Sequence, residues 1–394
     1  MDLLLSAENL AFRDEVRAFL ADNVTPDMRR AIDLTTGFLV EPHVLIAFHR
    51  ALDRKGWSVP HWPVEHGGTG WSPVERYIFD LECGRAGAPT YNASGSHFVG
   101  PVIIRYGTPA QKEKYLPRIR SGEDFWAQGY SEPGSGSDLA SLKTRAVADG
   151  DAYVLNGQKI WTTLAHRANR IFALVRTSSA GKRQDGITFL LIDMDTPGVR
   201  VRPIIGSGGD HEFNEVFFED ARVPKESRIG EENKGWEVAK YLLEFERGGR
   251  VLAGQVRAAF ARLVQLVAAR CPGDGDIRAR LAELGSDLDA MEMIDISVLS
   301  TVQAGGNPGP ISSLLKLRWS EIRQEIAELA VDAIGADALR WLPERPFYET
   351  LQLPPEEEET AAAIPRYLNS RAYSIMGGTS EIQTNILAKS LVGL

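Results

Sequence analysis

Cysteine is scarce in this chain of 394 residues, where only Cys83 and Cys271 occur. Two cysteines cannot build the disulfide framework of a small secreted domain, and no histidine or cysteine spacing suits a zinc ion. We therefore interpret both residues as ordinary buried or surface thiols, and we expect no metal site.

Long hydrophobic runs are also absent. No apolar stretch approaches the roughly 20 residues that cross a bilayer, and the amino terminus lacks the basic start and the cleavage site of a signal peptide. The net charge of −9 argues against a general nucleic-acid surface. We expect a soluble, cytoplasmic protein with no membrane insertion and no nucleic-acid partner. Local donors must then hold any polyanionic ligand.

The common nucleotide-binding motifs are missing. Neither GxGxxG nor GxxxxGK[ST] follows a predicted strand, so Rossmann and P-loop folds lose their main support. The chain has no internal repeat and is too long for one ordinary core, which indicates two or three compact units.

The periodicity changes twice along the chain. Helical patterns fill residues 6–120, short β-type runs occupy residues 125–228, and helical patterns return after residue 233. This order predicts an α+β fold and disfavours βαβ units. We place an N-terminal α-helical domain at residues 1–124, a middle antiparallel β-domain at residues 125–232 and a C-terminal helical bundle at residues 233–394.

Individual elements can also be predicted. Strands are expected at residues 152–155, 170–175, 187–193 and 214–220, and helices at residues 252–267, 277–303, 311–334 and 379–391. Asn156 and Gly157 lie between two apolar runs, which is a strong signal of a type I′ hairpin turn. We expect this turn to join residues 152–155 to residues 158–163.

Two stretches have a composition suited to ligand binding. Residues 128–138, QGYSEPGSGSD, combine glycines that let a ligand approach the backbone with serine hydroxyl donors. Residues 160–163, IWTT, place an aromatic face beside two hydroxyls. Taken alone, the first stretch is more typical of turns and the tryptophan of the second is more typical of a core.

In combination, these stretches resemble the acyl-CoA dehydrogenase family, nearly from end to end. The motifs that carry the resemblance are RYGTPAQKEKYLPRIRSGE at 105–123, YSEPGSGSDLASLKTRA at 130–146, NGQKIWTT at 156–163, FNEVFFEDARVP at 213–224 and GGTSEIQTNILAK at 377–389. The resemblance implies the acyl-CoA dehydrogenase fold, with FAD between the β-domain and the bundle.

The resemblance also implies roles for particular residues. The isoalloxazine edge would be contacted by Gln128, Tyr130 and Ser131, and the cofactor or the CoA arm by Gly136 and Ser137. The flavin would be flanked near N5 by Trp161, Thr162 and Thr163. The ribityl and diphosphate region would be contacted by Gly378, Thr379 and Glu381, at a helix N-terminus that favours phosphate.

The catalytic base of the straight-chain enzymes is missing, because Gly377 stands where they carry a glutamate. Its backbone N–H can still polarise the thioester carbonyl, as in the family. A subset of the family places the glutamate in a Glu-Arg pair on the helix that opens the C-terminal domain. Glu246 and Arg247 match that pair, so we expect Glu246 to be the base. A solvated helix residue paired with a cation is the alternative.

Neighbours of this pair are also informative. Glu244 and Arg247 match substrate-side positions of the family and are expected to orient the CoA arm. Gly248 and Gly249 would each cost about 1 kcal/mol relative to alanine inside a helix, so close approach of a ligand or a helix kink is expected there.

The resemblance implies FAD-dependent α,β-dehydrogenation of an acyl-CoA to the trans-2-enoyl-CoA, with a bulky, branched or steroid side-chain acyl group and an electron-transfer flavoprotein as acceptor. The family's Arg-x-x-Phe-Gly motif is missing from residues 268–278. This favours a heterotetramer with a related subunit that carries the motif, as in actinobacterial steroid enzymes, over a homo-oligomer. A non-catalytic subunit that completes a partner's FAD site and an acyl-CoA oxidase remain alternatives.

Overall fold

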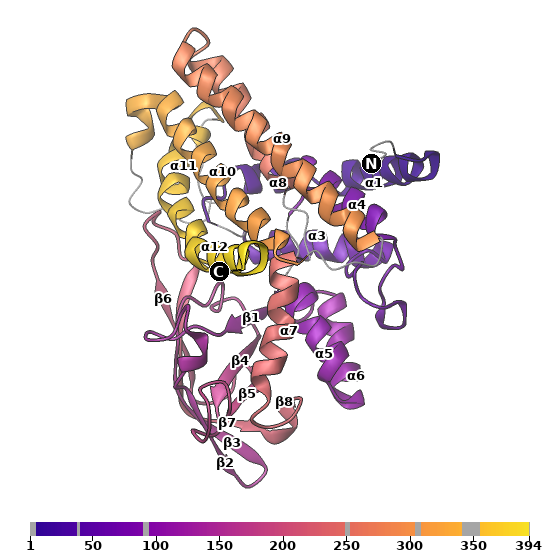
Figure 1. The fold of residues 1–394 in the computed structure, drawn as a ribbon, viewed down its shortest axis with the longest axis vertical. Coiled ribbons are helices and arrows are strands. Elements are labelled where there is room, and N and C mark those ends of the chain that lie inside the picture. The colour runs from indigo at the N-terminus through magenta and orange to yellow at the C-terminus, as the bar shows by residue number, and fades with distance from the viewer. Residues whose placement is uncertain are drawn as a thin grey trace.

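The protein is described here from a computed structural model of its 394 residues. The structure describes residues 5–37, 40–89, 94–248, 253–303, 309–340 and 355–393. Figure 1 shows the β-domain below a bundle of long helices, with the N-terminal helices to the right. This arrangement confirms the predicted α+β architecture of helices, then strands, then helices.

The N-terminal helices begin at clear capping signals. Thr25, Ser72 and Thr108 each accept a hydrogen bond from the third backbone N–H of the following helix, and a proline follows each of them at the first helical position. The helices of this region are α1 Ala7–Asn23, α2 Pro26–Leu34, α3 Pro42–Lys55, α4 Pro73–Arg85, α5 Gly100–Tyr106 and α6 Pro109–Arg120.

The middle of the chain forms one eight-stranded sheet with the order β6-β7-β3-β2-β4-β5-β8, and β1 pairs with β4. Its strands are β1 Trp126–Gly129, β2 Arg145–Asp149, β3 Ala152–Lys159, β4 Arg170–Arg176, β5 Ile187–Asp193, β6 Val199–Ile204, β7 Phe213–Pro224 and β8 Arg228–Ile229. Most pairs are antiparallel as predicted, whereas β1 and β2 pair with β4 in parallel.

The predicted hairpin turn at Asn156 and Gly157 is wrong. Strand β3 runs through both residues, and the hairpin lies earlier, where Asp149 pairs with Ala152. Gly157 instead marks a bulge against β7, and it must be glycine because a Cβ there would come within 2.6 Å of the Thr144 Cα atom. Close backbone approach, rather than a turn, explains this glycine.

The C-terminal part is helical again. Its helices are α7 Gly235–Gly248, α8 Ala253–Arg270, α9 Gly275–Gln303, α10 Ile311–Ile334, α11 Pro355–Ser370 and α12 Ser380–Leu387. The helices predicted at residues 252–267, 277–303 and 311–334 correspond to α8, α9 and α10. The fourth, predicted at residues 379–391, is the short α12 followed by a π-helical turn, Ala388–Val392.

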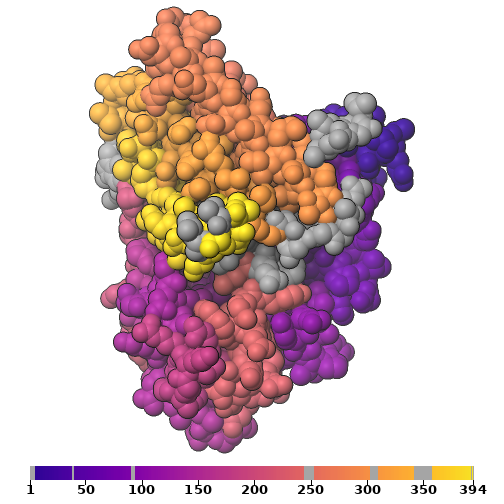
Figure 2. Space-filling model, viewed as in Figure 1, coloured from indigo at the N-terminus to yellow at the C-terminus, as the bar shows by residue number. Residues whose placement is uncertain are grey.

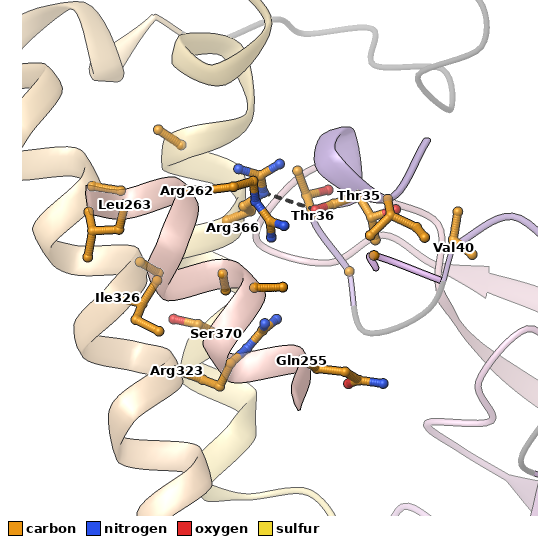
Figure 3. Close-up of a pocket in the computed structure, with 18 of the residues that line it drawn as sticks. Thr35, Thr36, Val40, Gln255, Arg262, Leu263, Arg323, Ile326, Arg366 and Ser370 are labelled. Carbon is orange, nitrogen blue, oxygen red and sulfur yellow. Dashed lines mark hydrogen bonds between the residues drawn. The ribbon is translucent and has the colours of Figure 1, made fainter. Parts of the chain in front are cut away.

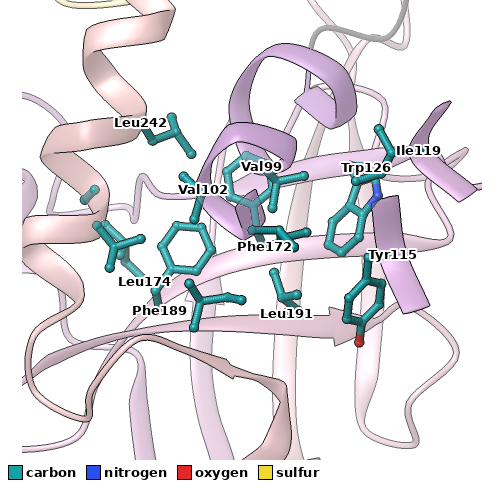
Figure 4. Close-up of a cluster of buried hydrophobic side chains, with 14 of the residues drawn as sticks. Val99, Val102, Tyr115, Ile119, Trp126, Phe172, Leu174, Phe189, Leu191 and Leu242 are labelled. Atoms are coloured by element: carbon teal, nitrogen blue, oxygen red, sulfur yellow. The ribbon is translucent and has the colours of Figure 1, made fainter. Parts of the chain in front are cut away.

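The largest buried cluster joins the sheet to helices from both helical regions. In Figure 4, Phe172, Leu174 and Phe189 of the sheet pack against Val102 of α5 and Leu242 of α7. All five side chains are fully buried. Helix α7 is thereby packed on the sheet through its first two turns.

None of the helices in the described parts of the chain is both long and apolar enough to cross a membrane.

Candidate functional site

The two predicted flavin-binding stretches lie side by side at one end of the sheet. Strand β1 leads into residues 130–137, and strand β3 leads into residues 160–163. The Ile160 N–H donates a hydrogen bond of 2.9 Å to the carbonyl oxygen of Ser131, which joins the two stretches directly. Two stretches that are well separated in the chain therefore lie in direct contact.

A buried ion pair holds these stretches together from behind. Lys159 is completely buried, and its Nζ atom donates to Glu132 Oε1 at 2.8 Å and to the carbonyl oxygen of Tyr130 at 3.1 Å. Glu132 also accepts hydrogen bonds from the backbone N–H groups of Lys143 and Thr144. Both charges are thus satisfied by partners inside the protein.

Electrostatics agree with this geometry. Burial alone would raise the pKa of Glu132, but Lys159 and the surrounding donors hold that pKa below its ordinary value. Burial lowers the pKa of Lys159, and Glu132 opposes this shift. Sequence analysis did not single out either residue. The available signal was a lysine at an inward-facing position of a strand, where an unpaired charge is rarely found.

The segment after β3 presents an aromatic ring outward. Trp161 has a φ of 59° and remains 58% exposed, and its indole packs edge-on against Phe213 with ring centroids 6.1 Å apart. A tryptophan in a strained backbone conformation that still faces solvent is unusual for a core residue. The structure therefore excludes the core interpretation of Trp161 within this chain.

Thr162 is fixed by a buried asparagine. Its backbone N–H donates to the Asn214 carbonyl, and its own carbonyl accepts from Asn214 Nδ2, both at 3.0 Å. Asn214 also contacts the rings of His166 and His211, which are stacked with centroids 3.8 Å apart. Burial lowers the pKa of His166 to about 4, so the His166 ring stays uncharged near neutral pH.

A third predicted segment caps α12. Thr379 accepts a hydrogen bond from the Ile382 N–H, and the preceding Gly377 and Gly378 adopt φ angles of 65° and 88°. Gln383 Nε2 donates to the carbonyl oxygens of both glycines. The Glu381 carboxylate accepts hydrogen bonds from its own backbone N–H and from the Thr379 hydroxyl. These bonds lower the pKa of Glu381. In Figures 1 and 2, α12 (yellow) lies at the edge of the bundle that faces the β-domain.

The residues at these segments fit a flat aromatic cofactor with polar edges. Thr162 Oγ1 is buried and has no hydrogen-bond partner among the described residues. A Cβ added at Gly136 would meet no atom within 4 Å, so space is open beside the backbone of that loop. An exposed indole, an unsatisfied hydroxyl and an open glycine loop are features that a bound flavin would cover and satisfy.

The expected base lies at the edge of the described chain. Glu244, Glu246 and Arg247 belong to the last turn of α7 and Gly248 is its final residue, but their side chains and Gly249 lie outside the described residues. The roles of Glu246, Glu244 and Arg247 therefore remain predictions.

Comparisons with known proteins agree along the chain. Family models of the acyl-CoA dehydrogenase N-terminal, middle and C-terminal domains match residues 6–123, 127–221 and 233–392. Acyl-CoA dehydrogenase IpdE1 of Mycobacterium tuberculosis is 39% identical over 391 residues, which cover 97% of each chain. Acyl-CoA dehydrogenase FadE26 of the same species is 31% identical, over 97% of this chain and 96% of the relative.

Solved structures extend this similarity. The Tcur3481-Tcur3483 steroid acyl-CoA dehydrogenase is 30% identical with a TM-score of 0.84, covering 100% of this chain and 99% of that one. The ChsE4-ChsE5 complex from Mycobacterium tuberculosis is 29% identical with a TM-score of 0.83 and the same coverage. The chain belongs to the acyl-CoA dehydrogenase family. It is therefore an oxidoreductase, and the resemblance noted in its sequence motifs is confirmed.

Proposed function

We propose that this chain binds FAD and dehydrogenates an acyl-CoA thioester at its α,β bond to give the trans-2-enoyl-CoA, with a steroid side chain or another bulky, branched acyl group as substrate. The observation that carries the proposal is the intact flavin frame, in which residues 130–137 and 160–163 are joined by a hydrogen bond and backed by the Lys159–Glu132 pair. The name of acyl-CoA dehydrogenase IpdE1 supports an acyl-CoA substrate. The name of the Tcur3481-Tcur3483 steroid enzyme supports a steroid acyl group.

Three segments would hold the cofactor. The loop after β1 would contact the ring edge through Gln128, Tyr130 and Ser131, and Gly136 and Ser137 would lie toward the cofactor or the CoA arm. The loop after β3 would flank the ring with Trp161, Thr162 and Thr163, and the start of α12 would face the phosphates with Gly378, Thr379 and Glu381. When bound, FAD supplies the two-electron oxidation of the Cα–Cβ bond by accepting hydride from Cβ.

The chain itself would handle the proton and the carbonyl. The Glu246 carboxylate would take the proton from Cα, and the Gly377 N–H would donate to the thioester oxygen and so acidify that Cα–H bond. Glu244 and Arg247 would orient the CoA arm. Substrate that covers Glu246 would remove water and raise the pKa of this carboxylate, which strengthens it as a base.

The proposal also covers the subunit assembly, the electron acceptor and the location of the protein. The chain lacks Arg-x-x-Phe-Gly at residues 268–278, and two similar solved structures carry the names of two chains. We infer a heterotetramer with a related subunit that supplies the missing arginine, an electron-transfer flavoprotein as acceptor and a cytoplasmic location. The domain bounds 1–124, 125–232 and 233–394 are part of this proposal.

The experiment is an anaerobic screen of the purified chain, alone and co-expressed with the companion subunit, against straight-chain, branched and steroid side-chain acyl-CoAs. Loss of the oxidised-flavin absorbance with a steroid acyl-CoA, together with formation of the enoyl-CoA, is expected. Full FAD occupancy of the chain alone would contradict the heteromeric assembly. Stoichiometric peroxide formation in air, without any need for an electron-transfer flavoprotein, would favour an oxidase instead.

A further inference from the structure

A second site lies away from the flavin segments, between the N-terminal helices and the C-terminal bundle. It is a partly open cavity of about 150 Å³ lined by residues of α2, α4, α8, α10, α11 and the segment that includes Val40. In Figure 3, Arg262 and Arg366 lie together opposite Thr35 and Thr36, and Arg323 lies toward Ser370. The walls thus bring three arginines from three different helices to one small space.

The three guanidinium groups differ in how they are satisfied. Arg262 pairs with Asp33 at 3.1 Å, and Arg366 pairs with Glu359 at 3.0 Å and donates from Nε to the Thr35 carbonyl. Arg366 Nη2 is nevertheless buried without a hydrogen-bond partner among the described residues. A buried cationic N–H group without an acceptor lowers the stability of the protein unless a ligand accepts a hydrogen bond from it.

Arg323 supplies the uncompensated charge. Its contacts are a long hydrogen bond of 3.5 Å to the Tyr373 hydroxyl and a position over the Tyr373 ring, with 5.6 Å between the guanidinium carbon and the ring centroid. In the described part of the chain no carboxylate forms an ion pair with it. Three arginines therefore face two carboxylates, those of Asp33 and Glu359. Burial lowers the pKa of Arg262, and the neighbouring arginines lower it further.

The rest of the cavity wall is partly polar and partly aliphatic. Ile32, Val40, Leu263 and Ile326 line it beside the arginines. A volume of about 150 Å³ is enough for one six-membered carbon ring. A ligand that matches this site has a carbon ring as its body and an anionic group at the end that faces the arginines.

The cavity lies close along the chain to the expected thioester site. Tyr373 lines the cavity, and Gly377 follows it after one irregular turn, in which the Met376 N–H donates to the Ala372 carbonyl. On the opposite wall, α8 comes soon after the last turn of α7, which contains Glu246. Both walls are therefore close along the chain to Gly377 and Glu246, the residues expected to act at the thioester and its α-carbon.

We propose that this cavity binds the far end of the acyl group, and that the preferred substrates are acyl-CoAs whose ring system carries a carboxylate distal to the thioester. The inference rests on the proposed function and specifies its substrate class. Arg323 and Arg366 Nη2 are the donors to the distal carboxylate, and the aliphatic residues contact the ring. The thioester of such a ligand then lies toward Gly377 and Glu246.

Binding can be tested without turnover by using unsaturated thioesters, which cannot be dehydrogenated again at the same bond. The probes are cyclohexylacryloyl-CoA and its derivative with a carboxylate on the ring carbon opposite the chain. Calorimetry on the FAD-loaded enzyme measures the Kd of each probe. We expect the Kd of the carboxylated probe to be about 10- to 100-fold lower than that of the probe without the carboxylate. Wild-type Kd values that agree within about twofold would overturn the proposal, and this comparison needs no variant.

Variants locate the effect. Arg323→Gln is expected to abolish most of the preference, and Arg323→Lys to retain part of it. The matched control is Arg318→Gln on the same helix, because Arg318 pairs outward with Asp287 and Glu321; it should keep the full preference. Equal loss in both glutamine variants would contradict a specific site. Turnover of the saturated thioesters is measured separately, so a preserved Kd ratio without turnover would refute the dehydrogenase proposal alone.

Discussion

Two cationic sites of this chain differ in how their charge is balanced. Lys159 in the β-domain has a carboxylate and a carbonyl within 3.1 Å. Within the described residues, by contrast, the arginine cavity of the helical region has one guanidinium without a carboxylate and one buried guanidinium nitrogen without an acceptor. The first site is complete by itself and acts as framework. The second is incomplete, so we interpret it as a place for a ligand.

A third site holds a buried carboxyl group that has no ion-pair partner among the described residues and bonds only to the Ala253 backbone there. Asp295 on α9 is mostly buried, and its Oδ2 atom has no hydrogen-bond partner in the described residues. Burial, and next the charge of Glu292, raise its pKa to about 7. Such a group becomes neutral instead of binding an ion. The three sites thus differ in how a charged group is stabilised: Lys159 pairs with a carboxylate, the arginine cavity is suited to an anionic ligand, and Asp295 takes up a proton.

The largest stability effect is expected from breaking the closed pair. Lys159→Met leaves Glu132 buried without its cation, which should cost about 3–5 kcal/mol of unfolding free energy. The measurement is chemical denaturation together with the FAD content per chain, and both should fall. Arg222→Met is the control, because Arg222 pairs with Asp149 on the exposed surface of the same domain, and it should change little. An unchanged midpoint in Lys159→Met would refute the framework role.

The second-largest stability effect is expected at Asp295, the buried acid whose pKa is raised. Because folding raises the pKa of Asp295 from 3.8 to about 7, the folded chain holds this proton more tightly than the unfolded chain. The contribution of Asp295 to stability therefore falls as pH rises from about 4 to about 7 and is constant above that. Asp295→Asn should stabilise the protein by up to about 4 kcal/mol at pH 8 and scarcely at pH 4.

The control for this prediction lies on the same helix. Asp289 is exposed and pairs with Arg257, so Asp289→Asn should not reproduce the pH dependence. Denaturation midpoints of wild type and both variants across this pH range decide the matter. A difference between Asp295→Asn and wild type that does not vary with pH would contradict the assigned shift.

The smallest effect is expected at the start of α12. Thr379→Ala removes the side-chain cap of this helix, which should cost about 0.5–2 kcal/mol and weaken FAD binding where the helix faces the phosphates. Thr379→Ser keeps the hydroxyl and should retain both properties. FAD dissociation measured by flavin fluorescence would show the loss. Equal FAD affinity in wild type and Thr379→Ala would remove Thr379 from the cofactor site.

Local signals in the sequence predicted much of the fold. The period of the apolar residues predicted the helical regions, because this pattern acts within a few residues. The same local reasoning failed at Gly157, where glycine is needed because the backbone of Thr144, just before β2, comes close. A glycine can be required by tertiary contacts that no local pattern contains.

The candidate site divides in the same way. Contiguous motifs predicted the candidate flavin-binding segments, and the Ile160–Ser131 hydrogen bond shows that two of these segments lie together. The arginine cavity could not be predicted, because Arg262, Arg323 and Arg366 belong to separate helices whose packing alone brings them together. Contiguous binding segments can therefore be predicted from the sequence, whereas side chains that only packing brings together, such as the Lys159–Glu132 pair and the three arginines, cannot.

The central claim is that Glu246 takes the α-proton, and one variant tests it most directly. In Glu246→Gln, loaded with FAD and assembled with the companion subunit, anaerobic mixing with an acyl-CoA substrate should reduce the flavin about 10²–10⁴ times more slowly than in wild type. Glu237→Gln, in the exposed first turn of the same helix, should react at the wild-type rate. Flavin reduction at the wild-type rate in Glu246→Gln would contradict the account.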